Sequence, residues 1–303
     1  MPSLQSRLIT GLLRLLRRKR IYGSAEAVRQ GIEAVRRAGP ARPSSRMRRA
    51  LVVQSLYCNG LEVYRLAPKS PRPQGGTLLY LHGGAYVRPI TSHHWRFLQA
   101  LVEASGFTLL VPLYPLAPEA CCLQSVAAVA AVYRQACEEA GRGPLALMGD
   151  SAGGGLALAL WQELPRHGMR RPDSLVLNCP WVDVAMTHPD IPRVEPLDPM
   201  LAVDGLREAG RLYAGAAGVD HPLVSPLHAD LAGLPPLLLF VGSRDIACPD
   251  ALLFAEKARQ AGTSVDLQVG DGLIHVWPIL PIPEARAARD AIVRHLHRHG
   301  ARD

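Results

Sequence analysis

The chain has 303 residues, of which 48% are hydrophobic and 20% are charged. This globular composition excludes wholesale disorder, collagen and coiled coil, and no apolar run approaches the roughly 18 residues of a membrane span. The formal net charge of +8 is unevenly placed, because residues 1–50 hold thirteen basic and two acidic side chains. The remaining 253 residues hold 21 basic and 24 acidic groups, so we predict that the folded domain does not bind nucleic acid.

The first twenty residues predict an amphipathic helix. At 100° per residue, one side of this helix carries leucines and the other carries arginines. The leucines are Leu4, Leu8, Leu12 and Leu15, and the arginines are Arg7, Arg14, Arg17 and Arg18. Such a helix can lie on an anionic membrane surface, or it can pack its leucines on the rest of the protein with the arginines in solvent. We favour the second interpretation.

The cellular location follows from the N-terminus and the cysteines. The apolar residues of the N-terminus precede its arginines, which reverses the order of a secretory signal. Six cysteines show neither a C-x-x-C pair nor a zinc-binding spacing, as is typical of free thiols in a reducing compartment. We therefore predict a cytoplasmic protein.

From residue 51 onward, short apolar runs alternate with longer amphipathic segments. The expected strands are 51–56, 61–66, 77–82, 108–112, 145–149, 175–179, 237–242 and 264–269, and the expected helices are 121–140, 152–167, 204–214, 250–261 and 284–299. This alternation predicts the α/β class, with a mostly parallel sheet covered by helices on both faces and an antiparallel edge formed by the first two strands. Residues 183–227, rich in Pro, His and Asp, predict an insertion over the sheet.

A candidate nucleophile lies between a strand and a helix. The motif Gly149-Asp150-Ser151-Ala152-Gly153 is a G-x-S-x-G sequence at a strand-to-helix turn. Such a turn holds a serine with its hydroxyl exposed, and the glycines allow the strand and the helix to approach closely. We predict that Ser151 is the nucleophile.

A second motif supplies candidate oxyanion donors. His82-Gly83-Gly84-Ala85 directly follows the third predicted strand. Acyl transfer builds negative charge on a carbonyl oxygen, and backbone N–H groups on a glycine turn can stabilise it. We predict an oxyanion hole formed by the N–H groups of Gly83, Gly84 and Ala152.

A serine nucleophile needs a base, and the base needs an orienting acid. His275 lies in the loop after the last predicted strand, and Asp245 follows the strand before it. The order Ser151, Asp245, His275 matches the order found in α/β-hydrolases. Asp250 is the rival acid, although it lies where a helix cap is expected.

These motifs resemble the hormone-sensitive-lipase family of α/β-hydrolases, the bacterial type IV esterases. The matching segments are 82–86, 114–119, 149–154, 180–183, 225–227, 233–236 and 275–277. The resemblance implies an α/β-hydrolase fold with an eight-stranded sheet, cap helices at 1–50, and a catalytic domain at 51–303 with a cap insertion at about 183–227. It also implies that no metal or cofactor is needed and that a homodimer is common. One departure is Asn178-Cys179, which replaces the usual serine before Pro-Trp.

Together these observations predict a carboxylic ester hydrolase that acts through an acyl-enzyme. The resemblance implies that its small-molecule substrates are short to medium acyl esters. A lactone hydrolase or an amidase remains possible on the same triad, and a non-catalytic small-molecule receptor is a further alternative. The predicted pocket residues are Tyr86, His93, Trp181 and Trp277. We also hypothesise that the leucine side of the N-terminal helix closes an apolar acyl pocket while its arginines stay outside.

Overall fold

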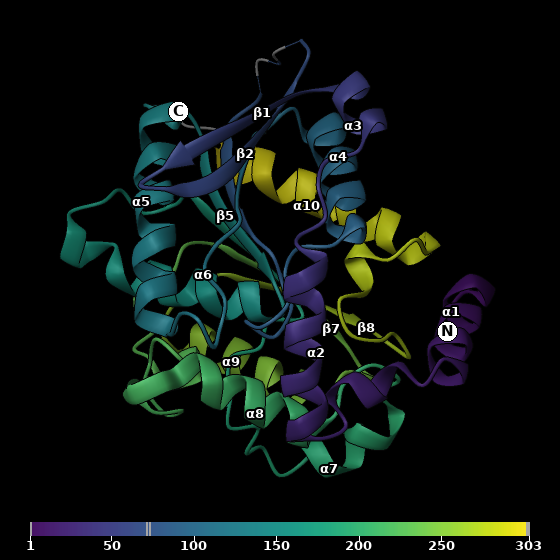
Figure 1. Ribbon diagram of the computed structural model, residues 1–303. Helices are drawn as coiled ribbons and strands as arrows, with labels where there is room; N and C mark the ends of the chain where they lie inside the picture. Colours follow the sequence, from purple (N-terminus) through teal and green to yellow (C-terminus); the bar gives the residue numbers. More distant parts are fainter. Residues whose placement is uncertain (1, 71, 73, 301–303) are drawn as a thin grey trace.

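The computed structural model describes residues 2–70, 72 and 74–300, so residues 301–303 of the predicted catalytic domain lie outside it. Its centre is an eight-stranded sheet in the order β1-β2-β4-β3-β5-β6-β7-β8 (Figure 1). The strands are β1 (Leu51–Cys58), β2 (Leu61–Pro68), β3 (Thr77–Leu81), β4 (Thr108–Pro112), β5 (Leu145–Asp150), β6 (Ser174–Asn178), β7 (Leu237–Gly242) and β8 (Val265–Gly270).

The strand directions bring the loops with functional motifs to one edge. β2 is antiparallel to β1 and to β4, whereas β4, β3, β5, β6, β7 and β8 are mutually parallel. The predicted antiparallel edge and α/β-hydrolase sheet are therefore confirmed. The loops that follow β3, β5, β7 and β8 lie at the carboxyl ends of parallel strands, where ligands bind in open α/β sheets.

Both faces of the central strands are buried, which explains their uniformly apolar sequences. In β3, Leu78 and Tyr80 belong to one core and Leu79 and Leu81 to the other. On the first face lie α4 (Ser92–Ser105) and α10 (Pro283–Gly300), whose buried side chains share a core with Leu78 and Tyr80. On the second face lie α5 (Cys122–Ala140), α6 (Ala152–Glu163) and α9 (Cys248–Gln260).

Segments from two distant parts of the chain lie together beside the sheet. They are α1 (Leu4–Leu15), η1 (Arg18–Tyr22) and α2 (Ala25–Ala38) from the N-terminus, and α7 (Ile191–Val194) and α8 (Val203–Ala214) from the predicted insertion. α2 and η1 both pack against α8. By contrast, α3 (Ser45–Ala50) packs on β1 and α4, so the predicted unit 1–50 is divided between the cap and the sheet.

Short 3-10 helices complete the fold. They are η2 (Pro165–His167), η3 (Glu195–Leu197), η4 (Gly215–Ala217), η5 (Pro226–His228) and η6 (Trp277–Ile279). Among the helices that the structure describes, none has the length and apolar character needed to cross a membrane.

The orientation of α1 corrects the favoured interpretation of the N-terminus. Its buried residues are Ser6 and Thr10, while Leu4, Leu8, Leu12, Leu15 and the following Leu16 are all exposed. The cause is a set of polar contacts: the Ser3 Oγ donates a 3.0 Å hydrogen bond to Glu284, and the Gln5 amide donates to the carbonyl of Pro281. The prediction that the leucines pack inward and close a pocket is therefore wrong.

Candidate active site

Ser151 occupies a sharp turn between β5 and α6. Its φ of +52° lies in the left-handed region, which non-glycine residues rarely adopt. The turn is held by a 2.9 Å hydrogen bond from the Ser151 N–H to the carbonyl of Asn178. A Cβ added at Gly149 would lie 2.2 Å from the Gly153 carbonyl oxygen, and one added at Gly153 would lie 2.0 Å from that of Leu81. The backbones therefore approach so closely that glycine is required at both positions.

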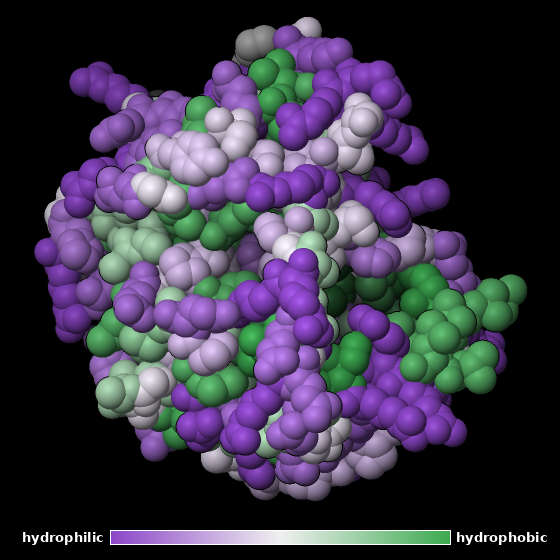
Figure 2. Space-filling model, in the orientation of Figure 1, coloured by the Kyte–Doolittle hydropathy of each residue, from purple (hydrophilic) through white to green (hydrophobic). Residues whose placement is uncertain are grey.

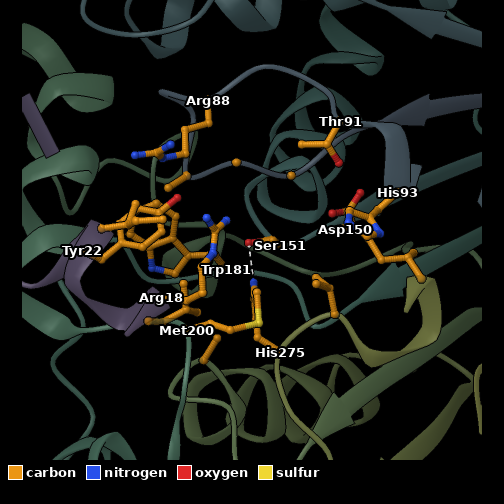
Figure 3. A pocket seen from close by; sticks show the side chains of 18 of the residues that line it. Arg18, Tyr22, Arg88, Thr91, His93, Asp150, Ser151, Trp181, Met200 and His275 are labelled. Carbon is orange, nitrogen blue, oxygen red and sulfur yellow. Dashed lines mark hydrogen bonds between the residues drawn. The ribbon is translucent and has the colours of Figure 1, made fainter. Parts of the chain in front are cut away.

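The structure brings Ser151, His275 and Asp245 together in one hydrogen-bonded chain. The His275 Nε2 lies 2.8 Å from the Ser151 Oγ, and the His275 Nδ1 lies 2.7 Å from Asp245 Oδ2. Figure 3 shows the serine and the imidazole facing each other. The Asp245 carboxylate also accepts a 2.9 Å hydrogen bond from the N–H of Ala247. This geometry allows a proton to pass from the hydroxyl to the imidazole while the carboxylate fixes the ring.

The charges around the imidazole favour its protonated form. Burial alone lowers the pKa of His275, but the negative charges of Asp245, Asp198 and Asp150 outweigh burial and raise it. Asp198, which the sequence did not single out, is 2% exposed, and burial and the charge of Asp245 raise its pKa to about 6. The base therefore lies among three carboxyl groups rather than one.

The rival acid Asp250 lies elsewhere. It is 1% exposed on the first turn of α9, and burial together with the charge of Asp183 raises its pKa to about 7. Ala247, not Asp250, is the N-cap of α9. No hydrogen bond recorded within the described chain joins Asp250 to His275, so the geometry supports Asp245 as the partner of the base.

Backbone N–H groups lie beside the serine with no acceptor among the described residues. Gly83 and Gly84 line the same cavity as Ser151, and Ala152 is the first residue of α6. Within residues 2–70, 72 and 74–300, the N–H groups of these three residues donate no recorded hydrogen bond. A Cβ added at Gly83 would lie 2.9 Å from the Ser151 Cβ, which shows how closely this turn approaches the serine. Free donors at a helix N-terminus favour a developing negative charge.

A largely apolar cavity of about 200 Å³ opens onto Ser151. Its apolar lining includes Ile21, Trp181, Met200, Leu201, Leu206, Ile279 and Leu280. His93 and Trp181, both predicted pocket residues, line this cavity (Figure 3). Arg18 and Arg88 also line it, so the expectation that the arginines stay outside is wrong for Arg18.

Two predicted pocket residues do not line this cavity. The Tyr86 ring is 1% exposed and stacks on Tyr213, with ring centroids 3.5 Å apart. Trp277 packs edge-on against Phe240, and its Nε1 donates a 3.1 Å hydrogen bond to the Val241 carbonyl. Both aromatic rings belong to the hydrophobic core. Each lies next to a catalytic motif in the sequence, but its packing partners turn it away from the cavity.

One cluster in the described chain has metal-ligand geometry. Donor atoms of Cys179, Asp245 and His275 all lie within 4.8 Å of one another. A metal ion there would have to replace the hydrogen bond between His275 and Asp245. These residues therefore fit a site in which Asp245 orients the His275 imidazole, and they do not fit a resident metal ion.

The family model described as the alpha/beta hydrolase fold matches residues 78–279. The chain belongs to this family. A crystal structure of an esterase from the bacterial hormone-sensitive lipase family is 30% identical, has a TM-score of 0.81, and covers 99% of this chain and 100% of that one. The resemblance to the hormone-sensitive-lipase family is thereby confirmed.

Relatives of similar sequence are named as hydrolases. An acetyl-hydrolase of Streptomyces hygroscopicus is 37% identical over 69% of this chain and 72% of its own length. An esterase of Acinetobacter venetianus is 32% identical over 70% of this chain and 71% of its own. The crystal structure of EstE5 soaked with p-nitrophenyl butyrate is 27% identical, has a TM-score of 0.86, and covers 99% of this chain and 100% of that one.

Proposed function

We propose that the protein is a serine carboxylesterase that hydrolyses short to medium acyl esters. The observation that carries this proposal is the hydrogen-bonded triad of Ser151, His275 and Asp245. Its serine faces an apolar cavity, beside backbone N–H groups that have no acceptor in the described part of the chain. Membership of an esterase family supports the same reaction. A receptor that only binds its ligand would not need the aligned base and acid.

In the proposed reaction, His275 removes the proton of the Ser151 hydroxyl as the oxygen attacks the ester carbonyl. The N–H groups of Gly83, Gly84 and Ala152 stabilise the oxyanion. His275 then protonates the departing alcohol, and an acyl-enzyme remains on Ser151. Water, deprotonated by the same imidazole, releases the acid and restores the serine. These steps use side chains, backbone and water, so the reaction requires no metal or cofactor.

The size of the cavity supports a small acyl group. Its volume of about 200 Å³ is below the roughly 300 to 1,000 Å³ of pockets that hold drug-sized ligands. The acetyl-hydrolase relative and the butyrate ester soaked into EstE5 are consistent with short chains. The cytoplasmic location and the homodimer stay predictions.

The test is to remove the nucleophile. Ser151→Ala should lower the turnover of p-nitrophenyl butyrate by roughly 10⁴-fold or more, and it should abolish covalent labelling by an organophosphate. Ser55→Ala, which removes an exposed serine on β1, serves as the matched control and should behave like the native chain. Undiminished hydrolysis by Ser151→Ala would refute the proposal.

A further inference from the structure

The exposed side of α1 is apolar. We define the leucine face as Leu4, Leu8, Leu12, Leu15 and Leu16, whose exposed fractions range from 53 to 79%. Figure 2 shows it as a hydrophobic projection at one side of the molecule, where Figure 1 places α1. We infer that the leucine face docks the mouth of the active-site cavity onto an anionic lipid surface. This inference goes beyond the proposed hydrolysis, because binding to lipid does not depend on catalysis.

The helix is held in a fixed orientation rather than hanging free. At the start of the helix, the Ser3 hydroxyl donates a hydrogen bond to Glu284 of α10. Near its end, the Arg14 guanidinium donates a 3.2 Å hydrogen bond to the carbonyl of Leu197. Lys19, just beyond the helix, donates to the carbonyl of Glu195. An amphipathic helix in a globular protein normally turns its apolar side to the core. Here the polar side is anchored, and the leucines are presented outward.

The side chains around the leucine face are positively charged, and they favour an anionic partner. Residues 1–25 contain six basic side chains and no Asp or Glu. Arg7, Arg17 and Arg20 are exposed, and no salt bridge recorded for the described chain includes them. A second copy of this helix would bring a like charge against this one, which opposes self-association. Apolar side chains flanked by unpaired arginines are the pattern of a helix that lies in the interface of an anionic bilayer.

The leucine face lies beside the entrance to the cavity. Arg18 and Ile21, a few residues after α1, both line the cavity that reaches Ser151. On the other side, Leu280 lines the cavity and the adjacent Pro281 accepts the hydrogen bond from Gln5 of α1. Figure 2 shows a hollow next to the leucine face, and the deeper surface of this hollow is hydrophobic. Docking at the leucine face would therefore hold the cavity mouth near the lipid from which an ester can enter.

The experiment measures sedimentation of the full chain with sucrose-loaded vesicles. One set contains about 30% phosphatidylglycerol in phosphatidylcholine, and the other contains phosphatidylcholine alone. The native chain should bind the anionic vesicles, and high salt should weaken binding. Leu8→Gln/Leu12→Gln/Leu15→Gln should weaken binding roughly tenfold or more, because three apolar side chains no longer enter the lipid. Arg7→Gln/Arg20→Gln should weaken it on anionic vesicles alone.

The matched control is Tyr57→Gln/Leu123→Gln, which removes two exposed apolar side chains from β1 and α5, away from α1 (Figure 1). It should bind like the native chain. Hydrolysis of p-nitrophenyl butyrate without vesicles should be unchanged in all variants, which shows that they fold. The inference is overturned if the native chain does not bind anionic vesicles. It is equally overturned if the triple-leucine variant and the control variant bind these vesicles with the same affinity. It is also overturned if the leucine substitutions instead dissociate a dimer of the native chain.

Discussion

The Asp198 carboxylate accepts a 3.1 Å hydrogen bond from the N–H of Ile246, the residue directly after Asp245. A segment of the predicted insertion is thereby tied to the loop that carries the proposed acid. The other oxygen of Asp198 accepts hydrogen bonds from the N–H groups of Met200 and Leu201, at 2.7 and 2.9 Å. Both of these residues line the cavity. Asp198 therefore holds the backbone of the cavity wall, and its charge also raises the pKa of His275.

This link predicts the pH dependence of the reaction. His275 must be neutral to accept a proton, so kcat/KM should rise with pH through the pKa of His275. The acidic neighbours raise that pKa above its ordinary value of about 6.5. Asp198→Asn removes one negative charge that favours the imidazolium, so the midpoint should move to lower pH. The measurement is kcat/KM for p-nitrophenyl butyrate between about pH 5 and pH 9.

Asp190→Asn is the control for this pH experiment, because Asp190 is an exposed carboxylate of the same segment. It should leave the midpoint where the native chain has it. A midpoint for Asp198→Asn that equals or exceeds the native one would contradict a direct effect of Asp198 on the base.

A comparison of two acids tests the assignment of the triad. Asp245→Asn should lower kcat by about 10⁴-fold, since the amide can no longer hold the required tautomer of His275. Asp250→Asn should retain most of the activity, because Asp250 lies near Asp183 rather than His275. Both turnover numbers would be measured with p-nitrophenyl butyrate at the same pH. A greater loss in the Asp250 variant would show that the acid is assigned wrongly.

The sheet and the triad could be predicted because they rest on local patterns. Uniform apolar runs mark buried parallel strands, and residues that follow such strands meet at one edge of the sheet. Ser151, Asp245 and His275 each occupy such a position. Helix α4 was not predicted, and α2 was predicted only as one of the cap helices at 1–50, without bounds, although the boundary signals of both are present in the sequence. Ser24 accepts a hydrogen bond from the Ala27 N–H at the start of α2, and Gly106 ends α4 in the left-handed conformation.

The orientation of α1 and the role of Asp198 could not be predicted in the same way. A helical wheel shows which residues share a side, but not which side meets the body. For α1 that choice depends on Glu284, which is 281 residues away from its partner Ser3. Asp198 likewise reaches the loop of Asp245 only through the folding of the insertion over the sheet. Such tertiary contacts leave no periodic signal in the sequence.

Cys179 offers a test of a departure from the family pattern. Its Sγ lies within 4.8 Å of the donor atoms of Asp245 and His275. Burial and the charge of Asp245 raise the pKa of the Cys179 thiol well above its usual value, so the thiol stays protonated and can donate to the carboxylate. Cys179→Ala should therefore reduce kcat by roughly tenfold and shift the pH midpoint, because the Asp245 carboxylate loses a neighbouring donor.

The hydroxyl of Cys179→Ser restores a donor at the same position, so this variant should recover most of the lost kcat. Kinetics and thermal unfolding would be measured for both variants. Loss of stability in Cys179→Ala without any change in the pH profile would indicate that the thiol only fills space in the core.

Leu201 tests which wall limits the acyl chain. Leu201 is 6% exposed and lines the cavity, whereas Leu234 is 7% exposed in the same hydrophobic core and does not line it. Either leucine-to-alanine change should lower the free energy of unfolding by about 2 to 5 kcal/mol. Only Leu201→Ala also enlarges the space beside Ser151, so it should shift kcat/KM toward longer acyl chains. The measurement compares p-nitrophenyl esters from acetate to dodecanoate, and the same shift in Leu234→Ala would mean that general loosening, rather than the cavity wall, sets the preference.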